Sequence, residues 1–576
     1  MKVGIFFGGP SREREISFAG GKTAYEHLDK QLFEAIPVFV DSFGRFIKVQ
    51  PEVLYKKEIR DFYPAKNQNQ DADGYRLYAE SHPELATQEV AAEIGELIQP
   101  QDFARHFDFA FLAMHGPDCE DGAIQGLLEW YRIPYSGPGL MGSAVGIDKI
   151  LQNEMIALAN GQEKKTDVLR HEDWQTGDRR SIFEKIKQEL RLPIVVKAPH
   201  QGSSIGVAIV QNDDFQEFVE AINQCFFQIE LTWDDWRKLS HVEKKNWAQR
   251  LANLDEGIGF PVIAGNQTFY HPDSLIKFLE QTFAKNDQIP TLSSNNAEDQ
   301  VLLEAFVRGQ EFSCGCIQLA DGTPFALPPT EVIKMAEVFD FNSKYKPGAT
   351  RKRIPVDTTF EKNQEIREMI ALVFGRLGIN VCARIDGFLT LEGKILLHDP
   401  NTIPGMSPAS LIFKQMAEIG LNVTQSLTYF IRQSIRERIR TGKEVWQLRD
   451  LLTKLDAGIK AGVEANLPPK RIIFGADNAQ YAAAQREFGL INAAGTHRAV
   501  AILKVHEEEI YQLPVQIMFK EYVEDVLQAC QQERDPLLVR AFEEGKSVAE
   551  FYAGAGDLEV KLISLDGTGE IEIKTI

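Results

Sequence analysis

The chain has 576 residues, of which 44% are hydrophobic, and a formal net charge of −20. This length suits a globular protein of several domains, and the negative charge argues against the basic surface of a nucleic-acid-binding protein. No apolar run reaches the ~18 residues of a membrane-spanning helix, and the apolar start, KVGIFF, is too short for a signal peptide. We therefore expect a cytoplasmic protein with no nucleic-acid or membrane partner.

The first elements along the chain predict a parallel sheet. Residues 2–7 form a short apolar run that ends at Gly8-Gly9, and residues 107–116 form a second apolar run. A helix-like stretch, residues 122–132, follows the second run. Strand, turn and helix in this order are typical of the βα unit of a parallel sheet.

The central part of the chain predicts antiparallel strands. Residues 192–199 and 207–211 read as strands that flank a Gly-Ser-Ser turn, and residues 301–333 contain several strands with an Asp-Gly turn. Residues 381–401 predict a hairpin with Glu-Gly at its tip, and residues 411–440 predict a helical region. Cys314 and Cys316 could be a redox pair, although their stretch, EFSCGCIQL, is also typical of a buried strand.

Two segments stand apart from these blocks. Residues about 213–298, rich in Trp, Asn, Asp and Gln, separate two strand-rich blocks and are interpreted as an insertion. Beyond about residue 441 the pattern of helices and strands restarts, which predicts a further domain. We therefore expect residues 441–576 to form a separate C-terminal domain.

Two loops have the composition of phosphate-binding segments. KAPHQGSSIGV places Lys197, several backbone N–H groups and two serine hydroxyls between strands, which suits polyphosphate. A serine-rich hairpin is the alternative, and the order of a Walker A loop is absent. NSKYKPGATRKR, residues 342–353, contains five basic residues and predicts either a lid over phosphates or a solvated loop.

The stretch GGPSREREIS places a glycine turn between a strand and a helix. Such a turn is a common site for an anion or a carboxyl group. The alternative is a structural role, in which Ser11 caps the helix and Glu13 and Glu15 complement its dipole.

The stretches ARIDGF and LLHDPN predict a metal site on adjacent strands. Arg384 and Asp386 alternate with apolar residues and share one face of a strand, and Asp399 and Asn401 share one face of the next. Three oxygen ligands on neighbouring strands suit Mg²⁺ beside phosphates, whereas no Cys/His cluster suggests zinc. A solvated sheet face that carries the same acids is the alternative.

These stretches together resemble the D-alanine–D-alanine ligases of the ATP-grasp superfamily. The matching segments, in order, are GGPSREREIS, AMHGPDCEDGAIQGLLEWYRIPYSGPG, DKILQNEM, VVKAPHQGSSIGV, LLEAFVRGQEF, NSKYKPG, ARIDGF and DPNTIPGMSPASL. The resemblance implies an α/β (α+β) chain. Residues 1–148 would form a Rossmann-like parallel-sheet domain, residues 149–440 an ATP-grasp domain, and residues 441–576 an additional α+β domain.

The resemblance also implies a reaction. ATP would phosphorylate the carboxylate of a first D-alanine, and the amine of a second would attack the acyl phosphate, giving a dipeptide for peptidoglycan precursors. The implied cofactors are ATP with one or two Mg²⁺ ions, or Mn²⁺. The implied partners are D-alanine or related small D-amino acids, together with a second subunit in a homodimer.

The catalytic roles come from the resemblance as well. Glu13 matches the glutamate that holds the first substrate's amino group and anchors a hydrogen-bonded triad with Ser203 and Tyr345. Arg384 and the Gly405 N–H match the groups that stabilise the tetrahedral oxyanion. Tyr345 suggests an amine acceptor, because related depsipeptide ligases often have another residue there.

The remaining matched residues bind substrates, nucleotide and metal. His115 and Glu120 match residues lining the first substrate's pocket, and Ser410 matches the hydroxyl that binds the second substrate's carboxylate. The nucleotide and metal matches are Lys149 and Lys197 on the ATP phosphates, Lys344 on the transferred phosphate, Glu304, Ala305, Phe306 and Val307 on adenine, Glu311 on ribose, and Asp386, Asp399 and Asn401 on Mg²⁺.

The sequence departs from the family pattern at three places. Asp399 stands where a glutamate usually bridges two Mg²⁺ ions, and it is shorter by one methylene, roughly 1.5 Å. His398 is expected to face away from the site by strand alternation. Asp118 and Cys119 stand where glycines are usual. These departures leave two alternatives, a ligase for another D-amino acid or small acid and a catalytically weak regulatory homologue.

Overall fold

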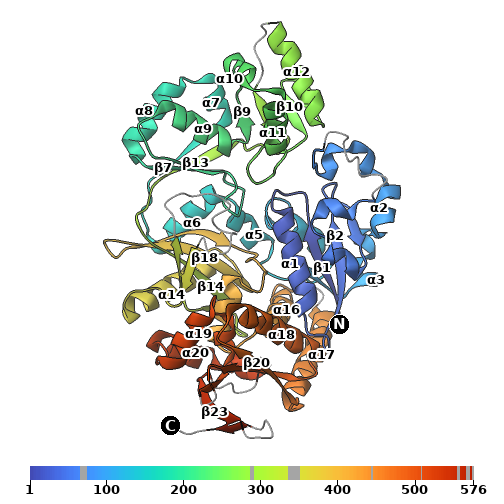
Figure 1. Ribbon diagram of the computed structural model, residues 1–576, viewed down its shortest axis with the longest axis vertical. Coiled ribbons are helices and arrows are strands. Elements are labelled where there is room, and N and C mark those ends of the chain that lie inside the picture. The colour runs from blue at the N-terminus through green and yellow to red at the C-terminus, as the bar shows by residue number, and fades with distance from the viewer. Residues whose placement is uncertain are drawn as a thin grey trace.

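The computed structural model describes residues 1–64, 74–285, 291–334, 350–442, 445–506, 509–553, 558–565 and 571–573. Within these residues the strands form five sheets. Figure 1 shows the N-terminal sheet on the right, residues of the expected insertion at the top and the C-terminal segment at the base. No helix in these ranges is long and apolar enough to cross a membrane.

The N-terminal sheet is built on parallel strands. β1 (Lys2–Gly8) lies between β2 (Glu34–Val40) and β5 (Phe109–Leu112) and runs parallel to both. The strands predicted in the first 116 residues are therefore confirmed, but the sheet is mixed and not purely parallel, because β3 (Phe46–Lys48) pairs antiparallel with β2 and with β4 (Glu96–Ile98). Every residue of β1 after Lys2 is buried, as expected for a central strand that is covered on both faces. The other elements are α1 (Arg14–His27), β3 (Phe46–Lys48), η1 (Pro51–Tyr55), η2 (Ile59–Phe62), η3 (Ala79–Ser81), η4 (Pro83–Ala86), α2 (Gln88–Ile94), β4 (Glu96–Ile98), η5 (Pro100–Asp102), α3 (Phe103–His106), α4 (Ala123–Trp130), α5 (Leu140–Ile147) and α6 (Lys149–Asn160).

Two antiparallel sheets occupy the centre of the chain. The first has the order β6-β13-β7-β8, and the second has the order β17-β16-β14-β18-β19 with β15 paired to β14. The first sheet and its helices comprise β6 (Thr166–Arg170), α7 (His171–Thr176), α8 (Arg179–Leu190), β7 (Ile194–Lys197), β8 (Val207–Val210) and β13 (Gln300–Ala305). The second comprises β14 (Gly309–Gln318), β15 (Pro324–Ala326), β16 (Thr330–Lys334), β17 (Thr350–Arg353), α14 (Phe360–Arg376), β18 (Cys382–Thr390) and β19 (Ile395–Asn401). The antiparallel strands predicted for this part are present.

The helical region predicted after the hairpin is two helices. α15 (Leu411–Glu418) and α16 (Val423–Arg440) are separated by a turn in which Gly420 has a φ of +99°. A left-handed backbone angle favours glycine, and it ends the first helix there. Both helices contribute to the same hydrophobic core, and α15 begins at the predicted site residue Ser410.

Between β8 and β13 the chain forms two packed groups. α9 (Phe215–Cys225) shares a hydrophobic cluster with the first antiparallel sheet through Phe218 and Ile222. A second cluster, around Trp236, Leu275 and Leu279, holds the rest of the segment and also includes Tyr75, Leu77, Ala198 and Ile205 from outside it. That rest comprises β9 (Gln228–Ile229), α10 (Trp233–Lys238), α11 (His241–Leu251), β10 (Val262–Ala264), β11 (Gln267–Phe269), α12 (Pro272–Ala284) and β12 (Leu292–Ser294).

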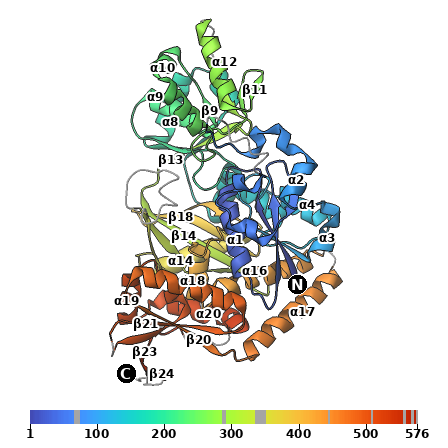
Figure 2. The ribbon, with the colours of Figure 1, turned by 45° about the vertical axis from the view of Figure 1, so that its right-hand side comes forward.

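The C-terminal segment adds a fifth sheet, in the order β20-β21-β22-β23-β24. Figure 2 shows this sheet below the rest of the molecule, with α17 extending beneath the N-terminal region. The elements are α17 (Val445–Glu464), β20 (Pro469–Gly475), α18 (Asn478–Ala494), β21 (Arg498–Lys504), β22 (Ile510–Leu513), η6 (Val515–Phe519), α19 (Val523–Gln531), α20 (Pro536–Ala553), β23 (Lys561–Leu565) and β24 (Ile571–Ile573).

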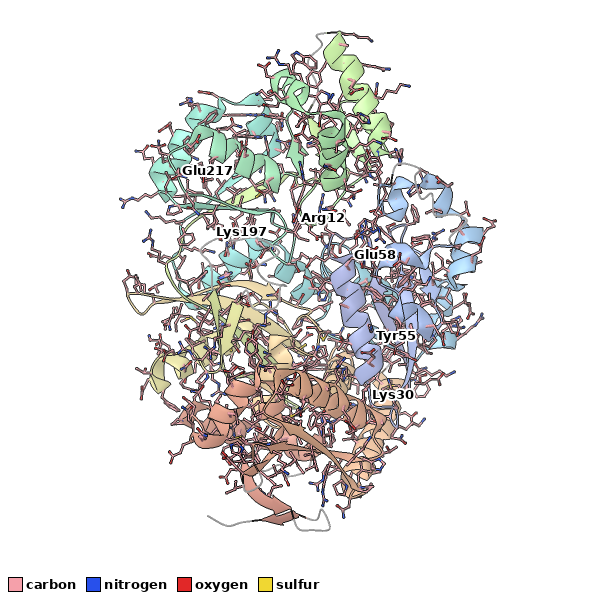
Figure 3. All side chains as sticks on the ribbon, in the orientation of Figure 1. Arg12, Lys30, Tyr55, Glu58, Lys197 and Glu217 are labelled. Carbon is pink, nitrogen blue, oxygen red and sulfur yellow. The ribbon has the colours of Figure 1, made fainter. Side chains whose placement is uncertain are left out.

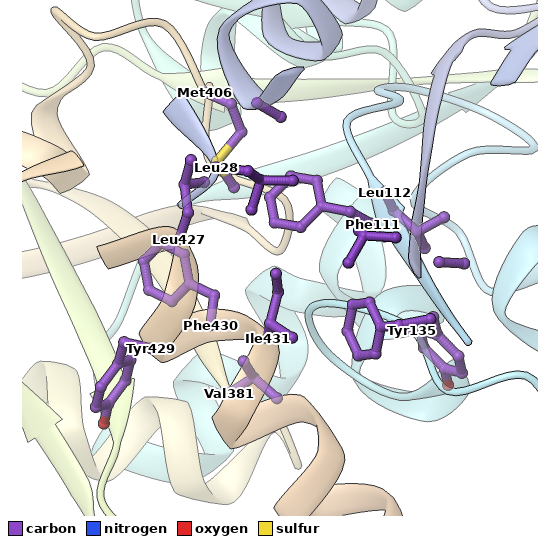
Figure 4. Packing of buried hydrophobic residues seen from close by; sticks show 14 of the residues in the cluster. Leu28, Phe111, Leu112, Tyr135, Val381, Met406, Leu427, Tyr429, Phe430 and Ile431 are labelled. Carbon is purple, nitrogen blue, oxygen red and sulfur yellow. The ribbon is translucent and has the colours of Figure 1, made fainter. Parts of the chain in front are cut away.

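One hydrophobic core joins the N-terminal, central and C-terminal parts. Phe111 of β5, Val381 before β18 and Phe430 of α16 belong to it, as Figure 4 shows, and each is at most 1% exposed. Met406, beside Gly405, and Leu455 of α17 belong to the same cluster. Burying one such side chain contributes about 1.5–3 kcal/mol, so this core holds the Gly405 loop and β18 against the N-terminal sheet.

The paired cysteines lie in the core. Cys314 and Cys316 are free thiols in β14, and both are fully buried. Burial raises the pKa of Cys314 to about 12 and raises that of Cys316 well above its usual value. Because a reactive cysteine needs an accessible thiolate, these residues fit the buried-strand interpretation and not the redox pair.

Candidate active site

Glu13 occupies the N-cap position of α1 and points into the serine-rich loop. Ser203 Oγ donates to Glu13 Oε1 at 2.5 Å, and the Gly202 N–H donates to Oε2 at 3.2 Å. A Cβ on Gly202 would lie 2.6 Å from Oε2, so only glycine allows this approach. Burial and the neighbouring Glu120 raise the pKa of Glu13. The predicted Glu13–Ser203 pair is thus assembled, and its expected third member, Tyr345, lies outside the described residues.

His115 lies just beyond β5, next to Glu120. Its Nδ1 is 3.4 Å from Glu120 Oε2. Its main chain is held by two serines: the His115 N–H donates to Ser17 Oγ at 2.9 Å, and its carbonyl accepts from Ser11 Oγ at 2.6 Å. Although burial opposes the charged ring, Glu120 and then Glu13 raise the pKa of His115. Two carboxyl groups thus flank one buried imidazole, and carboxyl oxygens are acceptors that suit a substrate ammonium group.

Lys197 ends β7 among carboxylates. Its Nζ is 3.0 Å from Glu304 Oε2 of β13 and 3.5 Å from Asp399 Oδ2 of β19. Lys164 Nζ and Asn153 Nδ2 donate to the other oxygen of Glu304, at 2.5 and 2.8 Å. Although burial opposes each charge, Asp399 and Glu304 raise the pKa of Lys197, and the two lysines lower that of Glu304. The opposite charges therefore favour the ionised forms of Lys197 and Glu304, whereas burial lowers the pKa of Lys164.

Lys149 links the two clusters. It is the first residue of α6, and its Nζ donates to the Gln201 carbonyl at 2.5 Å. Its positive charge acts on both Glu13 and Asp399. The charge of Arg384 likewise acts on His115. Of the predicted cationic residues, Lys149, Lys197 and Arg384 therefore converge on one region.

The segment expected to hold adenine runs through the end of β13. The Ala305 N–H donates to the Lys165 carbonyl at 3.1 Å, and the Phe306 N–H donates to the Pro193 carbonyl at 3.2 Å. Val307 follows in the connection to β14. Glu311 lies in β14 and lines a cavity together with Arg384. Lys344, expected on the transferred phosphate, lies outside the described residues.

The three expected metal ligands lie on the β18–β19 hairpin, whose register contains a β-bulge. Asp386 pairs with His398, whereas Arg384 pairs with Asn401, so Asp399 is the extra residue and has a φ of +45°. Residues directly opposite on an antiparallel pair share a face. The expectation that His398 faces away is therefore wrong: it shares the face of Asp386.

The environment of the hairpin residues differs from one to the next. Asp386 Oδ1 accepts from Ser313 Oγ at 2.6 Å and from Arg384 Nε at 3.3 Å. His398 Nδ1 is 3.0 Å from Asp399 Oδ2, and its ring stacks on Phe388 at 5.1 Å. Although desolvation opposes ionisation, Lys197 and His398 hold the pKa of Asp399 well below its usual value.

The hairpin supplies hard oxygen donors. Asn401 Nδ2 donates to the carbonyls of Asp399 at 2.9 Å and Arg384 at 3.4 Å, so its amide oxygen is the atom presented to a ligand. Across the described ranges no three His, Cys, Asp or Glu side chains form a metal-binding group. A cation here would be held by two carboxylates, Asp386 and Asp399, and one amide, a donor set that suits Mg²⁺.

Gly405 and Ser410 lie together after β19. A Cβ on Gly405 would be 3.4 Å from Ser410 Oγ, and Ser410 Oγ is 2.9 Å from Ser407 Oγ. Ser410 is the N-cap residue of α15, and its side chain does not cap the helix. The N-terminus of α15 and the hydroxyls of Ser407 and Ser410 are groups that could bind a carboxylate. A cavity of about 720 Å³ reaches Ser410, Arg384 and Asp386.

Arg12, beside Glu13, was not singled out from the sequence. Its guanidinium lies 3.9 Å from the centre of the Phe227 ring and is buried where the N-terminal part meets the segment between β8 and β13 (Figure 3). Its Nη1 donates to the carbonyls of Leu254 and Gly257, both at 3.2 Å, and its Nη2 donates to the Ile258 carbonyl at 2.9 Å. Nη2 also donates to Ser294 Oγ at 2.7 Å.

Glu298 fixes the neighbouring loop. His200 Nδ1 is 2.8 Å from Glu298 Oε2, and Gln201 Nε2 donates to Oε1 at 3.0 Å. Lys164, Asn153 and Glu298 also went unpredicted. None of them lies in a glycine-rich turn or in a strand where polar residues alternate with apolar ones. These two patterns indicated the other candidates.

Family models match most of the N-terminal and central chain. Residues 2–138 match the model described as D-ala D-ala ligase N-terminus. Residues 162–229 and 285–432 match the model described as D-ala D-ala ligase C-terminus. The interruption, residues 230–284, lies inside the segment interpreted as an insertion, and the match ends before the C-terminal segment.

Curated relatives and a solved structure agree with these matches. The D-alanine--D-alanine ligase of Geobacillus thermodenitrificans is 24% identical over 412 residues, which are 71% of this chain and 88% of the relative. That of Geobacillus kaustophilus is 26% identical over the same shares. The structure of the D-alanine-D-alanine ligase from Coxiella burnetii has a TM-score of 0.50 and 19% identity, and covers 79% of this chain and 99% of that chain, so the fold is shared. Because the two models together match more than half of the chain, the protein belongs to the D-alanine–D-alanine ligase family.

Proposed function

We propose that the protein uses ATP and Mg²⁺ to join two D-amino acids, with D-alanine as the first, through an acyl phosphate. The observation that carries this proposal is the contact of Lys197 with both Glu304 and Asp399, which brings the two central antiparallel sheets together. Nucleotide phosphates bound between these sheets would meet Lys197, Lys149 and the amides of the 202–206 loop. We also place the enzyme in the cytoplasm, as a homodimer that serves peptidoglycan precursor synthesis.

Phosphate binding would exchange the partners of the lysines. Lys197 pairs with carboxylates, whereas Lys149 donates to an uncharged main-chain carbonyl. Incoming phosphate oxygens would offer both lysines charge-assisted acceptors. Adenine would lie along Glu304–Val307 and ribose at Glu311. Asp386, Asp399 and Asn401 would hold Mg²⁺, which neutralises phosphate charge when bound.

The amino acids would be positioned from two sides. Glu13 and Glu120, with His115 between their charges, would hold the ammonium of the first D-alanine. Ser410 and the N-terminus of α15 would hold the carboxylate of the second. Its amine would then attack the acyl carbon, while Arg384 and the Gly405 N–H stabilise the oxyanion. Phosphate would leave, and the attacking nitrogen would lose a proton.

The experiment is to incubate the purified chain with ATP, Mg²⁺ and D-alanine and to follow ADP, phosphate and peptide by mass spectrometry. We expect one ADP and one phosphate per D-alanyl-D-alanine. If millimolar D-alanine gives no ADP above background, the ligase assignment is wrong and a regulatory role is the remaining interpretation.

A second candidate differs only in the first substrate. Cys119 replaces a usual glycine, and its Sγ would lie 2.6 Å from a Cβ on Gly9, so the loop packs tightly against the glycine turn. Asp118 beside it has a φ of +66°. A changed loop would change the amino acid that fits beside His115, and a panel of D-amino acids in the same assay separates the two candidates.

A further inference from the structure

The cavity beside Ser410 has a wall from the C-terminal segment. On one side it is lined by Arg384, Asp386 and Ser410, and on the other by α18 and by Met518–Tyr522. The ligase family match ends at residue 432, so this wall lies outside the matched region. Pockets of ~300–1,000 Å³ hold ligands of drug size, and at about 720 Å³ the cavity exceeds the needs of a small amino acid.

The wall formed by α18 and Met518–Tyr522 is held together by hydrogen bonds and packs against α1, which begins at Glu13. Gln485 Nε2 of α18 donates to the carbonyls of Met518, at 2.9 Å, and Lys520, at 3.1 Å. One turn further along the same face of α18, a Cβ on Gly489 would lie 2.5 Å from His27 Cε1 of α1, so the two helices pack at glycine distance. The wall is therefore an ordered part of the cavity.

The cavity is rich in positive charge. Lys414 Nζ and Lys352 Nζ lie 3.0 and 3.3 Å from the same oxygen of Glu521, Oε1. Lys520 lies next in the chain, and it also lines the cavity, as does Arg486 of α18. Burial, and then the charges of Lys352 and Lys520, lower the pKa of Lys414 against the pull of Glu521. One carboxylate oxygen thus pairs with two lysines, and the charge of a third, Lys520, also acts on Lys414. We call Lys352, Lys414 and Lys520 the basic subsite, in a chain of net charge −20.

The other acidic residues that line the cavity, Asp386 and Glu311, do not pair with the basic subsite. Asp386 is paired with Arg384, and Glu311 is at the end expected to hold ribose. Neither therefore compensates the basic subsite, and the excess positive charge beside Glu521 favours an anion.

The basic subsite lies one helical turn from Ser410. The Lys414 N–H donates to the Ser410 carbonyl at 3.2 Å in the first turn of α15. Residues four apart lie on the same helix face with Cβ atoms about 5–6 Å apart, and helical side chains lean toward the N-terminus. A ligand whose carboxylate is held at Ser410 could therefore place a second anionic group at Lys414.

We propose that the acceptor site takes an amino acid with an acidic side chain, whose second carboxylate binds the basic subsite. This inference rests on the proposed ligase function and specifies its acceptor. The amine of the acidic acceptor forms the C–N bond, the bond from the acyl carbon to the phosphate oxygen breaks, and the amine proton is released. The product is a mixed dipeptide with a free side-chain carboxylate, together with ADP and phosphate.

The test compares two isosteric acceptors that differ in charge. The full-length protein is given ATP, Mg²⁺ and D-alanine, with either D-glutamate or D-glutamine as acceptor, and the mixed dipeptides are quantified. We expect kcat/KM for D-glutamate to exceed that for D-glutamine by on the order of 10-fold or more, the worth of one charge-assisted contact. Equal use of the two, or inhibition by D-glutamate without its incorporation, overturns the acceptor assignment. Absence of ADP formation with every amino acid overturns the ligase function itself.

Variants of the basic subsite test whether its lysines cause the preference for D-glutamate. Lys520→Gln should reduce the preference for D-glutamate over D-glutamine at least several-fold, and Lys352→Gln, on a different element, should do the same if one substitution impairs folding. Lys470→Gln is the matched control, because Lys470 lies on β20 and pairs with Glu487 away from the cavity. A preference that survives both subsite variants places the discrimination elsewhere and overturns the proposal.

Discussion

Lys197 Nζ of β7 lies 3.5 Å from Asp399 Oδ2 of β19. The two residues come from different antiparallel sheets and are 202 positions apart in the chain. Their contact closes the space between a sheet that ends in a serine-rich loop and a hairpin that carries the expected metal ligands. When nucleotide binds, Lys197 could contact a phosphate in place of Asp399, and Asp399 could contact the accompanying cation.

Substitution of Lys197 should weaken nucleotide use. In Lys197→Met, a charge-assisted contact is lost, and kcat/KM for ATP should fall about 10- to 150-fold, the equivalent of ~1.5–3 kcal/mol. Steady-state ADP formation measures the change. Lys185→Met is the matched control, because Lys185 is an exposed residue of α8 that pairs with Asp167; equal losses in both variants would contradict the assigned role.

Arg384→Ala should act on the chemical step. Removal of an oxyanion donor typically lowers kcat by on the order of 10²–10³, while KM for ATP should stay near its original value. Single-turnover measurements with saturating ATP separate the two parameters. A variant that changes only KM for ATP would show that Arg384 serves the nucleotide and not the oxyanion.

Asp399→Glu should tighten binding of the second metal ion. The longer side chain regains the roughly 1.5 Å that aspartate lacks, so the Mg²⁺ concentration for half-maximal activity should fall. A Mg²⁺ titration of activity tests this, with circular dichroism to show that the bulge tolerates the change. An unchanged Mg²⁺ dependence argues against a bridging role for this position.

Arg12→Met should destabilise the interface between the N-terminal part and the segment between β8 and β13. Burial lowers the pKa of Arg12 to about 10, and the guanidinium serves three buried or partly buried carbonyls and Ser294. Loss of these bonds leaves several acceptors unpaired. Each acceptor that water does not reach should lower the free energy of unfolding by ~1–3 kcal/mol. Urea unfolding measures the loss, and Arg105→Met, whose side chain is 81% exposed, should change the free energy of unfolding little.

The ion pairs of His200 should make the free energy of unfolding fall as pH rises from about 6.5 toward 10. Hydrogen bonds to Asp148 and Glu298 raise its pKa to about 10, above an unfolded value near 6.5. Because the folded state holds the proton more tightly, the contribution to stability is complete below about pH 6.5 and is lost as pH rises toward 10. Urea unfolding of wild type and His200→Gln at pH 6, 8 and 10 should give a difference that shrinks with pH, and a constant difference would exclude this linkage.

Much of the fold followed from local patterns. The strand at residues 2–7, the hairpin over 381–401 and the loop with Lys197 and Ser203 were predictable because apolar periodicity, glycine turns and Asp-Gly or Glu-Gly tips act over a few residues. Glu13 and Ser203 were paired only through the family resemblance, because nothing local relates positions 190 residues apart.

Strand alternation failed at Asp399. The rule placed His398 on the opposite face from the site, yet one extra residue in the register turns it toward Asp386. A bulge arises from how two strands are held by their neighbours, and the local sequence HDPN carries no sign of it beyond an aspartate that tolerates a left-handed backbone.

Sequence patterns alone predicted most of the order of elements and, through the resemblance, the family and a set of candidate site residues. The tertiary structure alone decided that Lys164 and Asn153 join Glu304, that Arg12 locks the segment after β8, and that α18 closes the cavity beside Ser410. The physical reason is range: turns and periodicity are set by neighbours along the chain, whereas buried charge pairs and cavity walls depend on which distant surfaces pack together.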